Sequence, residues 1–495
     1  MPFERPDVLL AGIAPEIALT VTALILLIAD AVFGRKENRW FLSVLSTVGL
    51  GIAIYLALTG WFDMDGPRLH LAGMVAVDGF ATFVKVTLAI FGILTVWLSR
   101  DYLARHELEE SEFYALVLFA VAGMMLMAGA ADLIMMFLAL EMFSIALYVL
   151  VGFRRRSIES QESAMKYFLL GAFSSAFFLL GIAFAYGAVG TTSLYGTQAD
   201  PGIFSFINSN PSENFGLLVI AAGLLTIGLG FKVAAVPFHM WTPDAYQGAP
   251  SPVTGFMAAA TKLAGFAAAL RLLDVSLFSM RVDWRPLVIG IAVLTMIVGS
   301  VLAVVQDDLK RLLAYSSIAH AGFVFTGLVA TSDRGVSGAL FYLATYGLTV
   351  LGAFAIISAL SGPDERRVRI TDYRGLFDEH PLMAGALTLF LLSLAGVPLT
   401  SGFVGKLLVF GAAVEAGYTW MVVVGVLASA IAAFFYLRVM VAMYMQEREG
   451  PAEPARFGPP AAGVVALTAV ATIVFGLLWS PLIEVAEKAT FFVGG

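Results

Sequence analysis

The chain has 495 residues, 60% of them hydrophobic and only 13% charged, with a formal net charge of −7. Soluble domains carry about 25% charged residues, so this composition excludes a globular protein that folds in water. The sequence contains no basic patch or nucleic-acid motif, and we therefore set nucleic acid aside as a partner.

Cysteine is absent from the sequence. The chain therefore has no thiolate to hold an iron–sulfur cluster or a zinc ion. The histidines show no i, i+4 pair of the kind expected on a metal-binding helix. We expect no cofactor and no metal in this chain, and we expect any electron transfer linked to it to occur in other subunits.

Apolar stretches of the length needed to cross a bilayer, roughly 20 residues, follow one another along the whole chain. They predict an all-α polytopic membrane protein with about fourteen transmembrane helices, at 8–33, 40–59, 76–99, 112–129, 131–152, 163–189, 214–240, 251–273, 285–306, 311–331, 335–360, 381–415, 419–445 and 460–487. The first stretch contains Pro15 and Glu16 and lacks the basic start of a signal peptide, so we expect a retained helix.

Basic residues are divided unevenly between alternate loops, and cytoplasmic loops are the ones that carry an excess of Lys and Arg. Sixteen lie on one side: Arg35, Lys36, Arg39, Arg100, Arg105, Arg154, Arg155, Arg156, Lys310, Arg311, Arg366, Arg367, Arg369, Arg374, Arg448 and Arg456. Seven lie in the other loops and at the two ends: Arg5, Arg68, Arg271, Arg281, Arg285, Arg334 and Lys488. The bias places both termini on the non-cytoplasmic side of the membrane.

The remaining basic residues fall inside predicted spans: Lys85, Lys166, Lys232, Lys262, Lys406 and Arg438. Lys166 is close enough to a cytoplasmic end to snorkel. Lys85 lies outside the repeats described below. A contact with another subunit, or a lateral link between proton paths, would account for a charge at this position. The acidic counterpart within a span is Glu141.

The charges at Glu141, Lys232, Lys262 and Lys406 are costly, since each takes about 2.5–3.5 kcal/mol at the bilayer centre before any pairing. A structural ion pair between helices is the alternative for any single one, but it explains the set of four poorly. Burial disfavours the ammonium form of lysine, so a buried lysine can release its proton near neutral pH. The four residues therefore predict a proton relay.

Helix-breaking residues accompany two of these lysines. Pro237, Pro243, Pro250 and Pro252 follow Lys232, and a run from Gly396 through Pro398 to Gly402 precedes Lys406. Non-helical backbone at membrane depth survives only where it is buried in protein or lines a watery cavity. Two interrupted helices in corresponding halves of a chain are a pointer to a transport pathway.

The spacing of the charges suggests an internal repeat. Lys232 and Lys262 are thirty residues apart, and Lys406 and Arg438 are thirty-two apart. Five helices separate equivalent points, and an odd number inverts the second unit relative to the membrane. We predict inverted five-helix repeats, each with a broken helix. The predicted parts are a three-helix segment at 1–111, repeats at 112–273 and 285–445, and a C-terminal helix at 446–495.

Histidines and hydroxyl residues extend the candidate relay. Ser316 and Ser317 lie one helical turn before His320, so the three can share a polar face; His320 belongs either to the relay or to the hydrogen-bonded core. Glu141, Ser144 and Tyr148 form a similar i, i+3, i+7 stripe. His239, beside Pro237, has a structural or water-organising role. Asp307, Asp308, Lys310 and Arg311 predict a solvated turn.

These motifs resemble the antiporter-like membrane subunits of respiratory NADH:quinone oxidoreductase, complex I. The matching stretches are Leu140–Ser144, Phe231–Pro252, Thr261–Lys262, Lys310–Ser317 and Ser401–Lys406, and they spread over nearly the whole chain. The resemblance implies that Glu141 pairs with Lys232, that Lys262 is the central proton carrier, and that Lys406 opens towards the far side.

The resemblance also implies the protein's setting. It predicts protons and channel water as the transported and mediating species, with other complex I membrane-arm subunits and the lipid bilayer as partners. Quinone reduction in other subunits, which hold flavin and iron–sulfur clusters, would drive transport. Lys406, the last of the four charges, is a lysine and not a glutamate, and a lateral C-terminal helix is not expected. Both points favour one subunit type of the family. A bacterial cell inner membrane is the expected location.

Two other functions remain open from the sequence. A subunit of a multi-subunit cation/proton antiporter would share the same helical unit. An independent secondary transporter would need a pocket for an organic solute, and no sequence feature identifies one.

Overall fold

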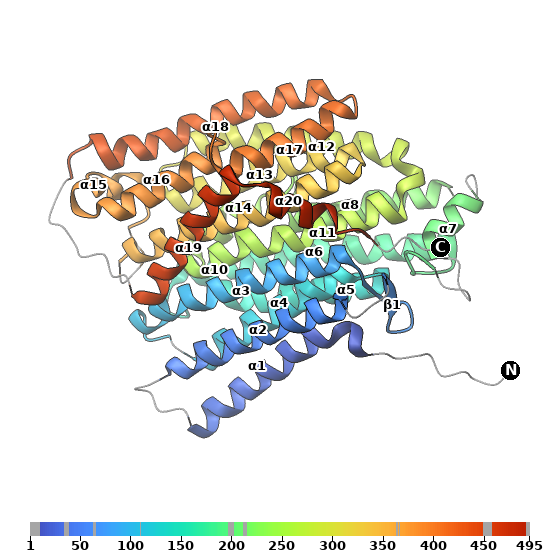
Figure 1. Cartoon of the computed structure of the whole chain (residues 1–495), viewed down its shortest axis with the longest axis horizontal. Coiled ribbons are helices and arrows are strands. Elements are labelled where there is room, and N and C mark those ends of the chain that lie inside the picture. The colour runs from blue at the N-terminus through green and yellow to red at the C-terminus, as the bar shows by residue number, and fades with distance from the viewer. Residues whose placement is uncertain are drawn as a thin grey trace.

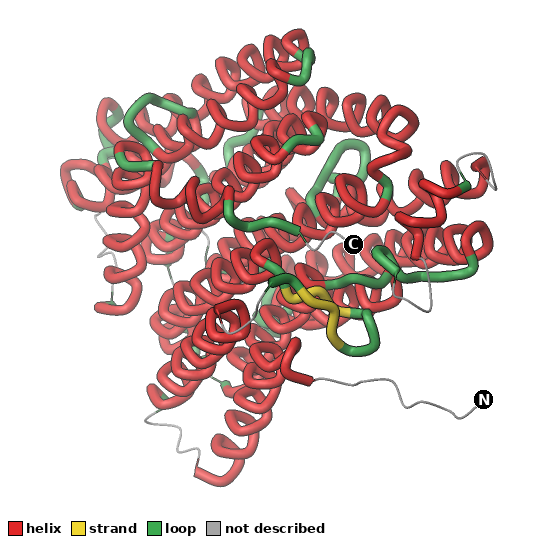
Figure 2. The backbone as a smooth tube through the Cα atoms, turned by 45° about the vertical axis from the view of Figure 1, so that its right-hand side comes forward, coloured by secondary structure: helices red, strands yellow, loops and turns green. Residues whose placement is uncertain are grey.

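The structure is a computed structural model that describes residues 10–33, 39–62, 66–108, 110–196, 202–210, 215–362, 365, 367–448 and 458–491. Of the basic residues used to orient the chain, Arg5, Arg35, Lys36, Arg366 and Arg456 lie outside the described residues. Almost all of the described chain is helical, and its two short strands form one hairpin (Figure 2).

The first part of the chain forms three long helices and the hairpin. Its elements are a 3₁₀ turn at Leu10–Ile13, α1 (Ala14–Phe33), α2 (Trp40–Phe62), β1 (Arg68–His70), β2 (Val75–Val77) and α3 (Gly79–Arg105). The strands are antiparallel, with Leu69 opposite Ala76.

The middle of the chain contains the first interrupted helix. Its elements are α4 (Ser111–Gly129), α5 (Leu133–Val151), α6 (Ile158–Val189), α7 (Gly202–Ser209), α8 (Phe215–Lys232), α9 (Trp241–Gly248), α10 (Ser251–Phe256), a π-helical segment at Met257–Thr261, α11 (Lys262–Leu270), a second π-helical segment at Arg271–Ser276 and a 3₁₀ turn at Phe278–Met280.

The last part contains the second interrupted helix. Its elements are α12 (Arg281–Val304), α13 (Leu309–Ala330), α14 (Asp333–Leu360), a 3₁₀ turn at Ile370–Tyr373, α15 (Leu376–Glu379), α16 (Pro381–Ala395), α17 (Ser401–Glu415), α18 (Thr419–Met445), α19 (Pro459–Leu477) and α20 (Ser480–Glu487).

Thirteen helices of the described residues are long and apolar enough to cross a membrane. The remaining predicted span, 381–415, is split into α16 and α17. In the predicted span 214–240, the helix α8 ends at Lys232. The prediction of a single helix at 460–487 is wrong, because the chain breaks between α19 and α20. The polytopic helical architecture and both expected interruptions are confirmed.

Side-chain caps explain where several helices begin. Asp78, Asp132, Ser157, Asp308 and Ser332 each accept a hydrogen bond from a backbone N–H in the first turn of the helix that follows. Such caps satisfy N–H groups that have no partner within the helix. The caps fix the ends of α3, α5, α6, α13 and α14, which enclose the candidate site.

The helices at the centre of the bundle differ from those at its edge. The span Ser251–Ser276 and the helices α13 and α14 are buried almost completely, whereas most of α1, α6 and α18 is not. The outer helices expose apolar residues such as Val21, Phe173 and Leu427, a pattern that suits contact with lipid. A charged side chain in the buried part of these helices, such as Lys262, is therefore removed from both lipid and bulk water.

The two ends of the bundle carry different elements. Figure 1 shows β1 and α7 at one end and α15 at the other. The two described ends of the chain meet near the start of α3: Lys85 contacts the carbonyl of Gly12, and the N–H of Phe80 donates to the carbonyl of Thr490. This arrangement is what an even number of crossings produces.

Candidate functional site

Lys232 is the last residue of α8 and is only 2% exposed. Its Nζ donates to the Ser144 hydroxyl at 2.6 Å. Glu141, one turn before Ser144 on α5, accepts a hydrogen bond from the Ser175 hydroxyl of α6. Among the described residues no direct ion pair joins Glu141 to Lys232, but the carboxylate acts on the ammonium electrostatically. Lys232 instead bonds to Ser144, whose own hydroxyl donates to the carbonyl of Leu140.

Four aromatic rings surround the Lys232 ammonium. The Nζ lies 5.5 Å from the ring centre of Phe143, 5.6 Å from those of Tyr148 and Phe231, and 5.9 Å from that of Tyr167. A cation within about 6 Å of an aromatic face is attracted to it. The rings therefore favour the protonated lysine at a place where water is excluded.

Gly171 on α6 makes room for one of these rings. A Cβ at this position would overlap the Tyr148 hydroxyl. We expect Gly171→Ala to push Tyr148 away from Lys232 and to lower proton transfer, although alanine favours the helix. The check is proton translocation by the assembled protein. Gly187→Ala, on the same helix with open space at its Cβ position, should behave like the wild type, and equal activity of both variants would contradict the prediction.

Lys262 stands next to the same helix break. It is the first residue of α11, directly after the π-helical segment Met257–Thr261. Its Nζ donates to the carbonyl of Val233 at 2.9 Å, and Val233 is the residue after Lys232. The two lysines therefore meet where α8 ends.

The break itself is held by side chains from other segments. The indole of Trp241 donates to the carbonyl of Phe231 at 3.0 Å, and the N–H of Val236 donates to Thr295 of α12 at 2.9 Å. These bonds satisfy backbone groups released by the break, as burial requires. His239 is half-buried, and no hydrogen bond or ion pair of the described residues joins it to the charged side chains of the site.

His320 on α13 lies in a cluster of tyrosines that the sequence did not reveal. Its Nδ1 is 2.7 Å from the Tyr342 hydroxyl of α14, and its Nε2 is 3.3 Å from the Tyr436 hydroxyl of α18. The Tyr436 hydroxyl also bonds to Ser316. Both ring nitrogens of this buried histidine thus have a hydroxyl partner, which links three helices.

Lys406 on α17 occupies the second break. Its Nζ donates to the carbonyls of Leu394 at 3.1 Å and Ala395 at 2.9 Å, and to the Ser429 hydroxyl of α18 at 2.7 Å. The two carbonyls belong to the last turn of α16. The C-terminal end of a helix carries partial negative charge, so the break creates a site for an ammonium group.

A small cavity separates His320 from the Lys406 site. Its volume is about 10 Å³, and its lining includes His320, Tyr346 and Leu394. This volume is near the minimum for one water molecule, about 10–15 Å³. The Tyr346 hydroxyl is buried without a hydrogen-bond partner of good geometry among the described residues, and the Ser317 side chain lies near it.

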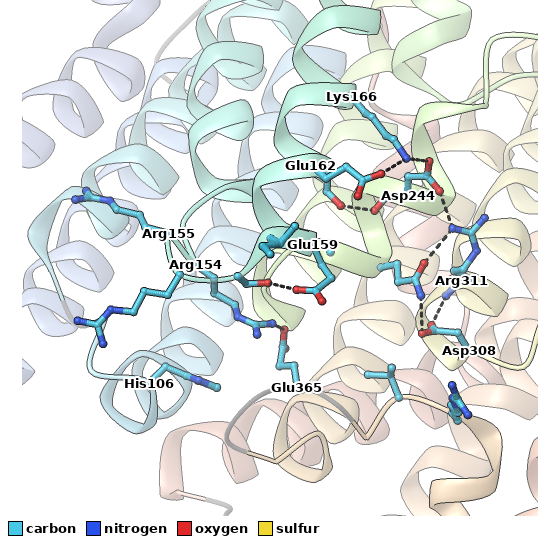
Figure 3. Close-up of a pocket in the computed structure, with 18 of the residues that line it drawn as sticks. His106, Arg154, Arg155, Glu159, Glu162, Lys166, Asp244, Asp308, Arg311 and Glu365 are labelled. Atoms are coloured by element: carbon cyan, nitrogen blue, oxygen red, sulfur yellow. Dashed lines mark hydrogen bonds and ion pairs between the residues drawn. The ribbon is translucent and has the colours of Figure 1, made fainter.

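A polar basin of about 1840 Å³ opens at the end of the molecule where the basic loops gather. Figure 3 shows Lys166, Asp244 and Arg311 meeting there. The distances are 2.9 Å from Lys166 Nζ to Asp244 and 2.6 Å from Arg311 to Asp244. Burial raises the pKa of Asp244, but the two cations outweigh it and leave the pKa below its ordinary value. Lys166 is exposed, as the snorkelling prediction required.

The basin approaches the tyrosine cluster through α9. Asp244 and Gln247 line the basin, whereas Tyr246 between them is buried. Its hydroxyl lies 3.5 Å from that of Ser317, one turn before His320. Helix α9 thus carries polar groups on both sides of the boundary between basin and interior.

Two other basic residues within the helices, Lys85, which is buried, and Arg438, which is half-buried, have partners inside the chain. Lys85 on α3 forms an ion pair with Glu16 of α1 at 2.7 Å. Arg438 donates to the carbonyls of Val304 and Gln306 at the end of α12. Neither of these sets of contacts involves a relay residue.

Arg271 was assigned to a loop, and this assignment is wrong. It begins the second π-helical segment, is fully buried, and forms a two-pronged ion pair with Asp78 at 2.9 and 3.0 Å. Within the described residues, no group of three or more His, Asp or Glu is placed to hold a metal ion.

Both a family model and individual relatives match this chain over most of its length. Residues 130–432 match the family model described as NADH:quinone oxidoreductase/Mrp antiporter, transmembrane. NADH-quinone oxidoreductase subunit N from Trichlorobacter lovleyi is 43% identical over 477 residues, covering 96% of each chain.

Solved structures agree with the sequence match. A chain of respiratory complex I from Thermus thermophilus superposes with a TM-score of 0.79 at 35% identity, over 95% of this chain and 98% of that one. A chain of the Mrp complex from Dietzia sp. superposes with a TM-score of 0.80 at 21% identity, over 97% and 96%. The second likeness is one of fold.

Proposed function

Because the chain belongs to the NADH:quinone oxidoreductase/Mrp antiporter transmembrane family, we propose that it translocates protons in the membrane arm of an NADH:quinone oxidoreductase. It corresponds there to the relatives named subunit N. The observation that carries the proposal is the set of four charges within the helical bundle: Glu141 on α5, Lys232 on α8, Lys262 on α11 and Lys406 on α17. Each is linked to a hydroxyl group or to a carbonyl at a helix break.

The relay begins at Glu141 and Lys232: Lys232 donates to Ser144, which lies one turn after Glu141 on α5, and Glu141 accepts from Ser175 of α6. Lys262 is the central carrier, because it reaches the carbonyl next to Lys232 from a separate helix. His320 and its tyrosine partners then lead to Lys406 through the small cavity. The contacts along this order are the hydroxyl groups beside Lys232, His320 and Lys406 and the Val233 carbonyl at Lys262. His239 stays outside the path.

Two inverted units at 112–273 and 285–445 organise this relay. The helix packing supports them: α4 packs on α5, α5 on α6, and α6 on the broken helix α8–α9, while α12 packs on α13, α13 on α14, and α14 on the broken helix α16–α17. One difference stands out, since Lys232 precedes its break and Lys406 follows its own. The two units therefore present their lysines from opposite halves of the broken helix.

The driving reaction takes place in partner subunits. The absence of cysteine leaves no thiolate for an iron–sulfur cluster in this chain. In this proposal flavin and iron–sulfur clusters belong to the partners, and this chain is a non-redox part of the enzyme. Quinone reduction elsewhere supplies the energy. The basin lies on the cytoplasmic side of a bacterial inner membrane, because its loops carry the excess of basic residues, and both termini lie on the opposite side.

Isolation of the native particle tests this function. The protein is extracted from its membranes in mild detergent, and the purified particle is assayed for NADH:quinone oxidoreduction, flavin and iron–sulfur centres. We expect all three to copurify with the chain. A particle that lacks them and exchanges sodium for protons in vesicles would instead establish a multi-subunit cation/proton antiporter.

A further inference from the structure

The junction between α9 and α10 is held from two directions. Lys310, at the start of α13, donates its Nζ to the carbonyl of Ala249 at 2.6 Å. Glu365 accepts hydrogen bonds from the N–H of Ser251, at 2.9 Å, and from its hydroxyl. A carboxylate at a helix N-terminus satisfies free N–H groups and suits the helix dipole. The first residue of α10 is thus fixed by a residue 114 positions later.

Glu365 also gathers charges from both predicted units. Its carboxylate lies 2.7 Å from Arg154, between α5 and α6, and 3.7 Å from the Lys310 ammonium. The side chains of Glu365 and Lys310 are 2% and 1% exposed, so the solvated turn predicted around Lys310 is wrong for that residue. Figure 3 shows Arg154 directed at Glu365 on the wall of the basin. This group of Arg154, Ser251, Lys310 and Glu365 is called the junction cluster below.

The backbone of Glu365 has a conformation that its contacts hold in place. Its φ is +52°, in the left-handed region that residues with a side chain rarely adopt. Such conformations persist where the surrounding structure holds them. Burial raises the pKa of the carboxyl, but Lys310 and Arg154 outweigh it and keep the pKa below its ordinary value, so Glu365 is ionised and can hold both cations.

The cluster stands on the helix that carries Lys262. From Ser251 the chain runs through α10 and the π-helical segment directly into α11, and every residue from Ser251 to Leu270 is buried. Packed interiors transmit displacements because they have few voids. A shift at Ser251 is therefore passed along about three turns to Lys262 and to its contact with Val233.

We propose that Glu365 is a positioning residue for proton transfer. It joins the two units at the basin and fixes the position of the continuous helix from Ser251 to Lys262, so that the Lys262 ammonium reaches the carbonyl of Val233. The proposal rests on the proposed proton-translocating function. Glu365 touches none of the relay residues itself, and its effect on them passes through α10.

The test uses the complete complex in proteoliposomes. Glu365→Gln keeps the size and one acceptor of the side chain but removes its charge. We expect the complex to assemble and oxidise NADH, with fewer protons translocated per electron than in the wild type. Because Lys310 acts through the same junction, Lys310→Met combined with Glu365→Gln should lose little more than either single variant.

Controls separate this proposal from the proposed function. Asp307→Asn changes an exposed carboxylate of the same basin and should leave the number of protons translocated per electron unchanged. A wild-type proton-to-electron ratio in Glu365→Gln, with a lowered ratio in Lys262→Ala, overturns the positioning role alone. A wild-type ratio in Lys262→Ala removes Lys262 from the path and so overturns the positioning role as well. Failure of the proposed function itself is recognised separately, by a native particle that lacks NADH:quinone activity. If Glu365→Gln does not assemble, Ser251→Ala decides, since a lowered ratio supports the role and a wild-type ratio refutes it.

Discussion

Lys262→Ala is expected to stop proton translocation through this chain while the complex still assembles. The ammonium is the group that bridges from α11 to the carbonyl of Val233, and alanine leaves no titratable atom at that point. Removing a group that transfers a proton costs about 10²–10⁴-fold in the step it serves. The measurement is the number of protons taken up per electron transferred by the complex in proteoliposomes.

Two further variants sharpen this result. Lys262→Arg keeps the positive charge but holds its proton too tightly to release it, so it should assemble well and translocate as poorly as alanine. Lys488→Ala changes an exposed lysine at the end of α20 and should match the wild type. An unchanged ratio in Lys262→Ala would remove this residue from the path.

Asp78→Asn is expected to have the largest effect on stability. The two carboxylate oxygens of Asp78 each accept a hydrogen bond from the buried guanidinium of Arg271. The guanidinium also donates to the carbonyl of Ala128 and to the Tyr195 hydroxyl. Removing one partner of a buried ion pair costs about 3–5 kcal/mol, because the other charge stays buried without compensation. Asparagine can still cap α3, so the loss reports mainly on the charge. The measurement is the temperature at which the chain dissociates from the purified complex.

An exposed pair supplies the comparison. Arg334 and Glu415 form an ion pair with side chains that are 51% and 60% exposed. Such pairs contribute about 0–1 kcal/mol, so Glu415→Gln should shift the dissociation temperature far less. Equal shifts for Asp78→Asn and Glu415→Gln would show that burial of the Arg271 pair adds nothing to stability.

The charged part of the site could be predicted because a charge within an apolar run stands out in the sequence. Glu141, Lys232, Lys262 and Lys406 were found in this way, and proline and glycine runs marked both breaks. The tyrosines were not found, since tyrosine is also an ordinary packing residue of membrane helices. The i, i+4 spacing of Tyr342 and Tyr346 was an available signal, because both rings face His320.

The two wrong predictions about side-chain burial share one physical cause. Lys310 lies in a polar stretch that looks solvated, but Glu365 and Ala249 bury it. Arg271 follows an apolar run and looks like a loop residue, but Asp78 draws it into the bundle. In each case a partner distant in sequence determines the burial of the side chain, and neither composition nor periodicity describes that partner.

The fit of Tyr148 against Gly171 has a consequence for how such chains diverge. The Tyr148 hydroxyl fills the space that a Cβ at position 171 would occupy. A larger side chain at position 171 therefore requires Tyr148 to move or to become smaller. In an alignment of homologous chains the two columns should covary, with a bulkier residue at 171 accompanied by a smaller one at 148, and the space beside Lys232 would be conserved although neither residue is.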